Sequence, residues 1–171
     1  TDINELIYDS TSIHEVNGTV SIHQEVANLE NLRMKLFDGD VLLNGTYKAL
    51  TSKLAQTNFS YDIKGLDFKD AANYFTSIEK YAPVLKYCEG KLSTQMSLET
   101  QLDEFYSPIY QSLTGLGDLK SSQVAITGLP ILNKIASHLK TIDNPFAQQK
   151  IENLNLSFSF EDGRLTVKET P

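Results

Sequence analysis

Alternation of apolar and polar residues, the pattern of a strand that buries one face, runs through most of the chain. It is clearest at 92–102, where every second residue is leucine, methionine or threonine. It recurs at 58–64, where Phe59, Tyr61 and Ile63 share one side. With the stretches around the turns described next, the pattern predicts eight or nine strands.

Three dipeptides predict tight hairpin turns, because both central residues of such a turn need a positive φ. They are Asp38-Gly39, Asp162-Gly163 and Asn17-Gly18. The apolar pairs that these turns would place opposite each other are Leu36 with Val41, Met34 with Leu43, Phe160 with Leu165, Phe158 with Val167, and Ile13 with Ile22. The strands are therefore expected to pair as antiparallel neighbours.

Three segments carry helix signals. Asp67 can cap a first helix, whose apolar positions are Ala71, Ala72, Phe75 and Ile78. Pro130 suits the first turn of a second helix, with an apolar stripe of Leu132, Ile135, Ala136 and Leu139. A short third helix is expected over 107–114, with Gly115 as its stop.

The order strand, Gly-Leu, helix, proline turn and strand occurs twice, over 58–102 and 117–169. This predicts either an internal repeat or two unrelated helices that each follow Gly-Leu. Both interpretations stay open at this point. The abrupt polar start and the end at Pro171 indicate one domain, 1–171, taken from a larger protein.

The ratio of strands to helices predicts an α+β fold. We expect a twisted, mainly antiparallel β-sheet of hairpins that forms a groove or half-barrel, with two or three amphipathic helices covering it. Nine strands present roughly 860 Å² on one face, whereas three short helices cover roughly 540 Å². The surplus apolar face either closes on itself as an ordinary core or stays open as a trough for an acyl chain.

Composition and charge narrow the function. The 171 residues are 40% apolar and 22% charged, as in globular domains. A net charge of −7 argues against a nucleic-acid partner. Cys88 is the only cysteine, and neither the three histidines nor the carboxylates form a metal-ligand or acid/base pattern. The residues therefore predict no enzyme, no metal site and no cofactor.

Several segments resemble the β-repeats of the bacterial AsmA family. They are Leu32 through Tyr47, Glu89 through Leu98, Pro108 through Leu119, and the closing Phe158-Ser-Phe-Glu-Asp-Gly-Arg-Leu-Thr-Val. The resemblance runs from about Val16 onward. It implies a non-enzymatic periplasmic domain, tethered to the inner membrane by a segment absent here, that serves phospholipid transport and outer-membrane assembly. It implies no catalytic residues.

The expected lipid-facing or core residues come from both strands of the predicted hairpins and from 92–102. They are Met34, Leu36, Val41, Leu43, Met96, Leu98, Phe158 and Phe160. Their role would be to solvate a phospholipid or another acyl-chain ligand, and plain core packing remains the competing interpretation for each. The alternative function is a structural module whose strand edges dock onto envelope protein partners.

Overall fold

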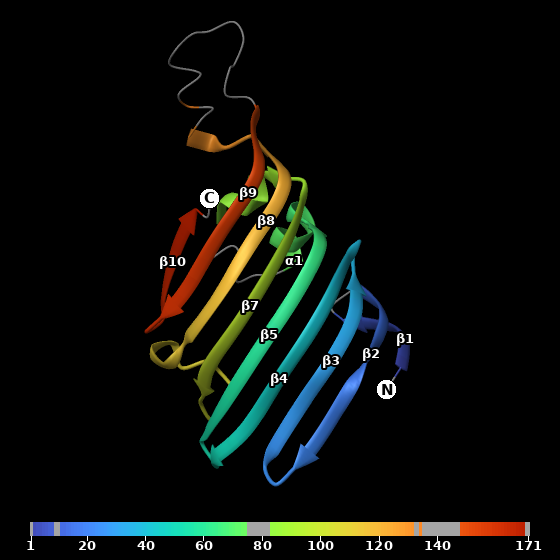
Figure 1. Ribbon diagram of the computed structural model, residues 1–171, viewed down its shortest axis with the longest axis vertical. Coiled ribbons are helices and arrows are strands. Elements are labelled where there is room, and N and C mark those ends of the chain that lie inside the picture. The colour runs from blue at the N-terminus through green and yellow to red at the C-terminus, as the bar shows by residue number, and fades with distance from the viewer. Residues whose placement is uncertain (1, 9–10, 75–82, 132–133, 135–147, 170–171) are drawn as a thin grey trace, which may run out of the picture.

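The structure is a single antiparallel sheet that curls without closing (Figure 1). The computed structural model describes residues 2–8, 11–74, 83–131, 134 and 148–169. The strands are β1 (Asp2–Tyr8), β2 (Thr11–His23), β3 (Val26–Leu36), β4 (Gly39–Thr51), β5 (Leu54–Asp67), β6 (Cys88–Glu89), β7 (Lys91–Leu102), β8 (Thr114–Thr127), β9 (Gln148–Glu161) and β10 (Arg164–Glu169).

The strands follow one another in space in the order of the sequence. The path is β1-β2-β3-β4-β5-β7-β8-β9-β10, and the two-residue β6 pairs with β8 beside it. Among the described residues, β1 and β10 are therefore the two edge strands of the sheet. The predicted α+β class is wrong: 74% of the described residues are in strands, and those residues include one α-helix instead of two or three amphipathic helices.

The hairpin predictions had mixed outcomes. The turn at Asp162-Gly163 is confirmed, with φ values of 49° and 71°, and it pairs Phe160 with Leu165 as expected. The turn predicted at Asp38-Gly39 is displaced by one residue. Phe37 takes the positive φ of 52°, and Leu36 pairs with Gly39 instead of Val41. Since the partner shifts by two residues, every side chain keeps its predicted face.

The third predicted hairpin, at Asn17-Gly18, is wrong. Both residues lie inside the continuous strand β2, which pairs with β1 on one side and β3 on the other. The turn comes later, at Gln24 and Glu25, whose φ values are 44° and 68°. Glu15, with φ of 53°, lies where the register between β2 and β3 shifts.

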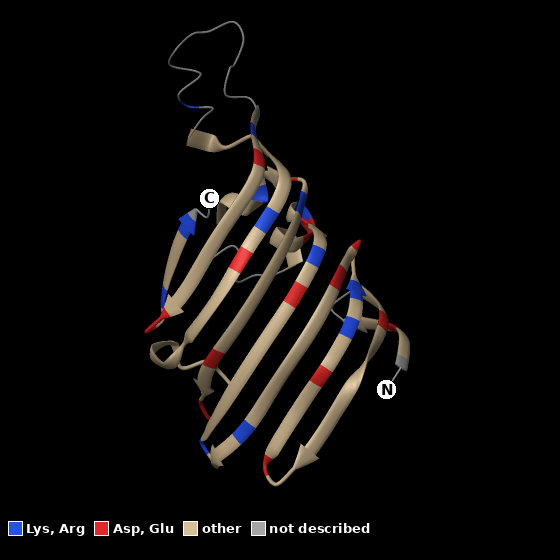
Figure 2. Cartoon of the chain, in the orientation of Figure 1, with Lys and Arg blue, Asp and Glu red and all other residues tan. Residues whose placement is uncertain are grey.

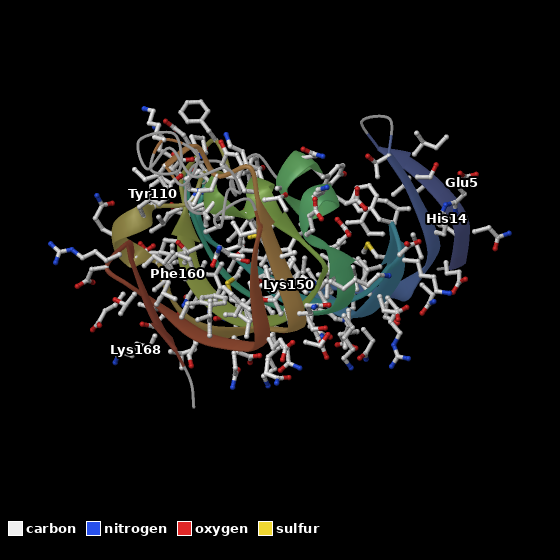
Figure 3. The ribbon with its side chains drawn as sticks, turned by 90° about the horizontal axis from the view of Figure 1, so that it is seen from above. Glu5, His14, Tyr110, Lys150, Phe160 and Lys168 are labelled. Atoms are coloured by element: carbon white, nitrogen blue, oxygen red, sulfur yellow. The ribbon has the colours of Figure 1, made fainter. Side chains whose placement is uncertain are left out.

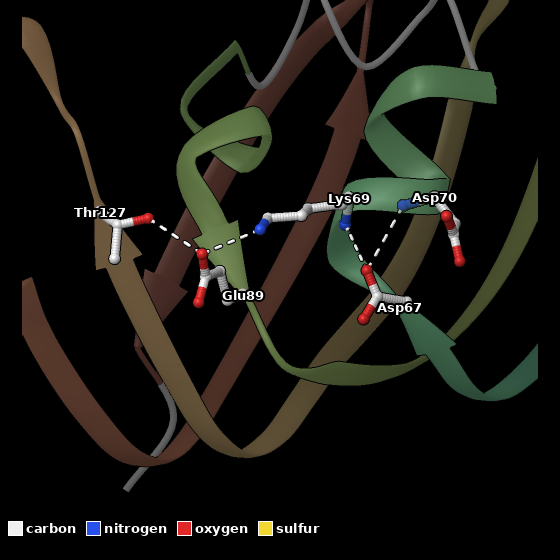
Figure 4. Close-up of polar contacts among 5 residues, drawn as sticks. All are labelled: Asp67, Lys69, Asp70, Glu89 and Thr127. Atoms are coloured by element: carbon white, nitrogen blue, oxygen red, sulfur yellow. Dashed lines mark hydrogen bonds and ion pairs between the residues drawn. The ribbon is translucent and has the colours of Figure 1, made fainter.

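Helix α1 (Phe68–Tyr74) begins where it was predicted. The Asp67 carboxylate accepts hydrogen bonds from the backbone N–H groups of Lys69 and Asp70, at 2.8 and 3.4 Å, and so caps the helix (Figure 4). The Lys69 ammonium donates to Glu89 at 2.8 Å, and Thr127 donates to the same carboxylate. These contacts join α1 to β6 and β8. The predicted positions Phe75 and Ile78 lie outside the described residues.

The other helix predictions fare differently. Most of the second helix, from Pro130 to Leu139, lies outside the described residues. The prediction of a third helix is wrong. Residues 107–114 contain only the 3-10 turn η2 (Tyr110–Ser112), and Gly115 is part of β8 instead of a helix stop. A second 3-10 turn, η1 (Pro83–Tyr87), precedes β6.

A cluster of buried residues lies at the end of the sheet that α1 covers, although Ala55, near the other end, is also buried. Its members are Leu66, Phe68, Ala71, Cys88, Leu92 and Val124. Phe68 is only 1% exposed. Burial raises the pKa of the Cys88 thiol, which therefore stays protonated and acts as a small apolar side chain. The helix thus shelters one end of the apolar face and leaves the rest of it to other contacts.

Gly65 and Gly128 occupy equivalent places in the two halves of the predicted repeat. Each follows a long run of strand residues, and their φ values are 71° and 69°. The repeat itself remains a prediction.

Candidate apolar ligand site

The curl turns one face of the sheet inward, and this face is apolar (Figure 3). Directly paired residues form rows that cross the strands on this face. One row is Met34, Val41, Ile63, Thr94, Leu119 and Leu156; the next is Leu32, Leu43, Tyr61, Met96, Gly117, Phe158 and Val167; the third is Leu29, Gly45, Phe59, Leu98, Gly115, Phe160 and Leu165. We call the surface formed by these three rows the trough.

The structure brings the eight predicted site residues onto this one face. Seven belong to the three rows, and Leu36 lies beside Met34 at the next inward position of β3. Leu36 and Val41 are buried, which suits core packing. The other six are half-buried: no described element covers them fully. Phe160 lies within the curl, whereas Lys168 points away from it (Figure 3).

Three glycines in the trough each face a phenylalanine, a feature that the sequence reasoning missed. Gly45 pairs with Phe59, Gly117 with Phe158 and Gly115 with Phe160. A Cβ on Gly117 would overlap the Phe158 ring. The missing side chain therefore lets the ring lie across β8, as aromatic residues do over glycines in strands.

Aromatic contacts continue along the trough. The Phe158 and Phe160 rings meet edge to face with centroids 6.2 Å apart, and those of Phe59 and Tyr61 do so at 6.4 Å. Such pairs fix ring positions more closely than aliphatic contacts do. The trough floor is thus formed by aromatic rings, methionine and leucine around small glycine hollows.

The trough is electrically neutral. From β3 to β9 its three rows contain no charged residue, whereas at the β10 edge Glu169 pairs with Leu156. The two polar side chains in the rows have hydrogen-bond partners. The Tyr61 hydroxyl lies 3.5 Å from Thr94 Oγ1, and Thr94 donates to the Asp118 carbonyl at 2.8 Å. Burial raises the pKa of Tyr61, so its hydroxyl stays protonated at physiological pH. An uncharged hydrocarbon matches this surface.

The opposite face of the sheet carries charged residues such as Asp62, which alternates with trough residues along β5, and Figure 2 marks where charged residues fall along the strands. Two shallow hollows of about 600 and 480 Å³ have Asn44, Ser60, Ser97 and Leu116 in common. These residues alternate with trough residues along their strands and therefore lie on the outer face. Leu116 is the large apolar exception there, with 70% of its surface exposed.

The described part of the chain shows neither a metal cluster nor a bilayer-spanning helix. No group of three or more His, Cys, Asp or Glu side chains within it could hold a metal ion. Among the same residues, no helix has the length and apolar character needed to cross a bilayer.

Comparison with known proteins found no match. The chain matches no protein-family model, no curated protein and no solved structure. The resemblance to the AsmA family thus depends on the quoted segments alone and remains a prediction.

Proposed function

We propose that this domain is a non-enzymatic lipid carrier that holds a phospholipid acyl chain in the trough. One observation carries the proposal: the apolar face extends well beyond the buried core, and its residues there are only half-buried among the described residues. Apolar surface left open over several strands is typical of a binding surface. A ligand that covers it would remove this surface from water.

The dimensions suit a lipid tail. With the neighbouring row that contains Tyr47, Thr57 and Thr100, the trough spans positions 57 to 63 of β5. Six residues of strand correspond to about 20 Å. One leaflet of a bilayer has a hydrocarbon thickness of about 15 Å, half of the ~30 Å core. An extended tail therefore fits along the strands.

The chemistry of the trough supports carriage instead of catalysis. A neutral surface of rings and aliphatic side chains attracts hydrocarbon without selecting a headgroup. The resemblance to AsmA proteins suggests where such a carrier would act. On that basis the proposal places the domain in the periplasm, tethered to the inner membrane outside this segment, in lipid transport to the outer membrane.

A matched pair of leucines tests this proposal. Leu98 lies in the trough and Leu116 on the outer face, on adjacent strands. Leu98→Gln puts an amide against the bound tail, so the fraction of protein that carries lipid in native mass spectrometry should fall at least about fivefold, a loss of ~1 kcal/mol. Leu116→Gln should leave that fraction unchanged.

Two outcomes would contradict lipid carriage. One is a wild-type protein that shows only the apo mass after incubation with phospholipid micelles. The other is an equal loss in both leucine variants, which would indicate that the trough does not hold the tail.

A second candidate function uses the edge strand β10. Its apolar side chains Leu165 and Val167 remain 39% and 54% exposed, so the edge could receive a strand from a protein partner. In a two-residue hairpin the pair flanking the turn is hydrogen-bonded and bonded pairs then alternate, so the N–H of Val167 should point away from β9.

Proline substitution in β10 tests this edge. Val167→Pro should abolish strand addition by a partner and leave the hairpin and lipid uptake intact. Thr166→Pro, whose N–H should bond to β9, is the matched control and should destabilise the hairpin itself. Binding to envelope proteins can be measured by crosslinking and pull-down. If Val167→Pro left this binding unchanged, the result would contradict docking through the β10 edge.

A further inference from the structure

One end of the sheet carries exposed aromatic and apolar side chains on its loops. In the loop between β7 and β8, Phe105 and Tyr106 are 77% and 72% exposed, and Tyr110 is exposed as well. Leu50, near the end of β4, belongs to the same end of the sheet and is also exposed. We call Leu50, Phe105, Tyr106 and Tyr110 the aromatic rim.

The loop that presents these rings is held in a fixed conformation. The Asp103 carboxylate accepts hydrogen bonds from the backbone N–H groups of Phe105 and Ser107, each at 2.9 Å. The Asp103 N–H donates to the Ser107 carbonyl at 3.0 Å, which closes the turn. Tyr106 has a φ of 60°, unusual for a bulky residue. The loop therefore keeps two large rings in water, at a cost in stability that plain connection of two strands does not require.

The aromatic rim is continuous with the trough. The Tyr106 ring lies against Tyr47, at 6.4 Å between centroids, and Tyr47 points to the trough face from the row beyond Gly45. The Ser112 hydroxyl lies 3.1 Å from that of Thr100, on the same row. The other end of the trough is filled by the core around Phe68. Among the described residues, then, the aromatic rim lies at the end of the trough away from α1, where η2 contacts Thr100 and leaves it only 3% exposed.

The charges near the aromatic rim decide which surface it suits. Lys53 pairs with Glu104 at 3.2 Å, and the other charged groups nearby are Lys48, Asp103 and Glu25, one basic against two acidic. This end therefore has no excess positive charge to attract anionic lipids. Tyrosine favours the interface between headgroups and acyl chains, where its apolar ring and polar tip are both accommodated, and phenylalanine buries its ring on the acyl side of that interface.

We propose that the aromatic rim inserts into the surface of a zwitterionic phospholipid bilayer and that lipid enters the trough there. The inference builds on the lipid-carrier function proposed above and assigns its point of exchange. The rings enter the interface, the Lys53–Glu104 pair stays among the headgroups, and the tail moves past Tyr106 and Tyr47 onto the trough floor.

The chain contains no tryptophan, so a single introduced one reports its own surroundings. Phe105→Trp should shift its emission to the blue on addition of phosphatidylcholine vesicles and should be quenched by phosphatidylcholine with brominated chains. Val84→Trp is the control, since Val84 is 43% exposed on η1, beside the covered end. Its emission should not change. The shift in the Phe105→Trp variant should persist at high salt because ring burial, not charge, causes it.

A second variant tests membrane insertion without an introduced tryptophan. Phe105→Ser combined with Tyr106→Asn removes both rings, and asparagine tolerates the positive φ at position 106. Vesicle partitioning, measured by co-sedimentation, should weaken at least about tenfold, and loading of the trough from detergent micelles should be retained.

The outcomes separate the two proposals. Unchanged partitioning of the double variant, an equal emission shift in the Val84→Trp control, or binding only to anionic vesicles at low salt would overturn insertion through the aromatic rim, even if the trough still holds lipid. Absence of lipid from the wild-type trough after micelle loading would overturn the carrier function itself.

Discussion

Phe68→Ala should lower the free energy of unfolding by about 3–5 kcal/mol, the largest effect that we expect from a single substitution. Phe68 is 1% exposed and packs among Leu66, Ala71 and Val124, where α1 closes one end of the sheet. Its loss removes a ring that α1 and the strands share. The remaining elements cannot collapse into the cavity without moving the helix. Urea denaturation followed by circular dichroism measures the change.

Phe105→Ala is the matched control for this substitution. It removes the same ring from a site that is 77% exposed, so the free energy of unfolding should change by no more than about 0.5 kcal/mol. Equal losses in the two variants would contradict the location of the core.

Gly117→Val should cost about 1–3 kcal/mol of stability and also disturb ligand uptake. A Cβ at this position would overlap the Phe158 ring and come within 2.7 Å of the Gln95 carbonyl oxygen. Because the backbone of β7 cannot retreat without breaking its ladder, the ring must leave the glycine hollow. It would then stand in the trough, where the tail is proposed to lie.

Near-UV circular dichroism, chemical denaturation and native mass spectrometry together measure this prediction. Leu116→Val, one residue earlier but on the outer face, is the control and should alter none of the three. A Gly117→Val protein of wild-type stability and lipid content would show that Phe158 does not depend on the glycine.

Most of the sheet could be predicted from the sequence because the two-residue period of a strand is a local property. Met34 and Val41 lie on the predicted face although the hairpin register is shifted, because a shift of two residues leaves each side chain on the same face of the sheet. The start of α1 was also predictable because the Asp67 cap bonds to backbone N–H groups only two and three residues further along, at 2.8 and 3.4 Å.

The failures come from contacts distant in sequence. Phe37 accepts an unfavourable φ because its ring packs edge to face on Tyr74, at 5.7 Å, and against the core. Asn17-Gly18 has the residues of a turn, but pairing with strands on both sides keeps β2 continuous through it. In both places tertiary pairing outweighs the local preference.

The candidate site was partly predictable for the same reason. Alternation placed the eight expected residues on one face, but it could not show which of them the helix covers. The pairing of trough glycines with phenylalanines was missed, in part because Gly115 was interpreted as the stop of a helix. Its position opposite a phenylalanine, as at Gly45 and Phe59, is visible only once the register is known.

The succession of strands in the sheet has a consequence for how the protein forms. With the exception of the small β6, each strand lies next to the strand before it along the chain. Apart from the β5–β7 and β8–β9 pairings, which close long connections, the strand pairs form between hairpin neighbours, and such local pairing favours rapid folding. A nascent chain emerging from the ribosome or a translocation pore could add one hairpin at a time to an existing edge, without waiting for its far end.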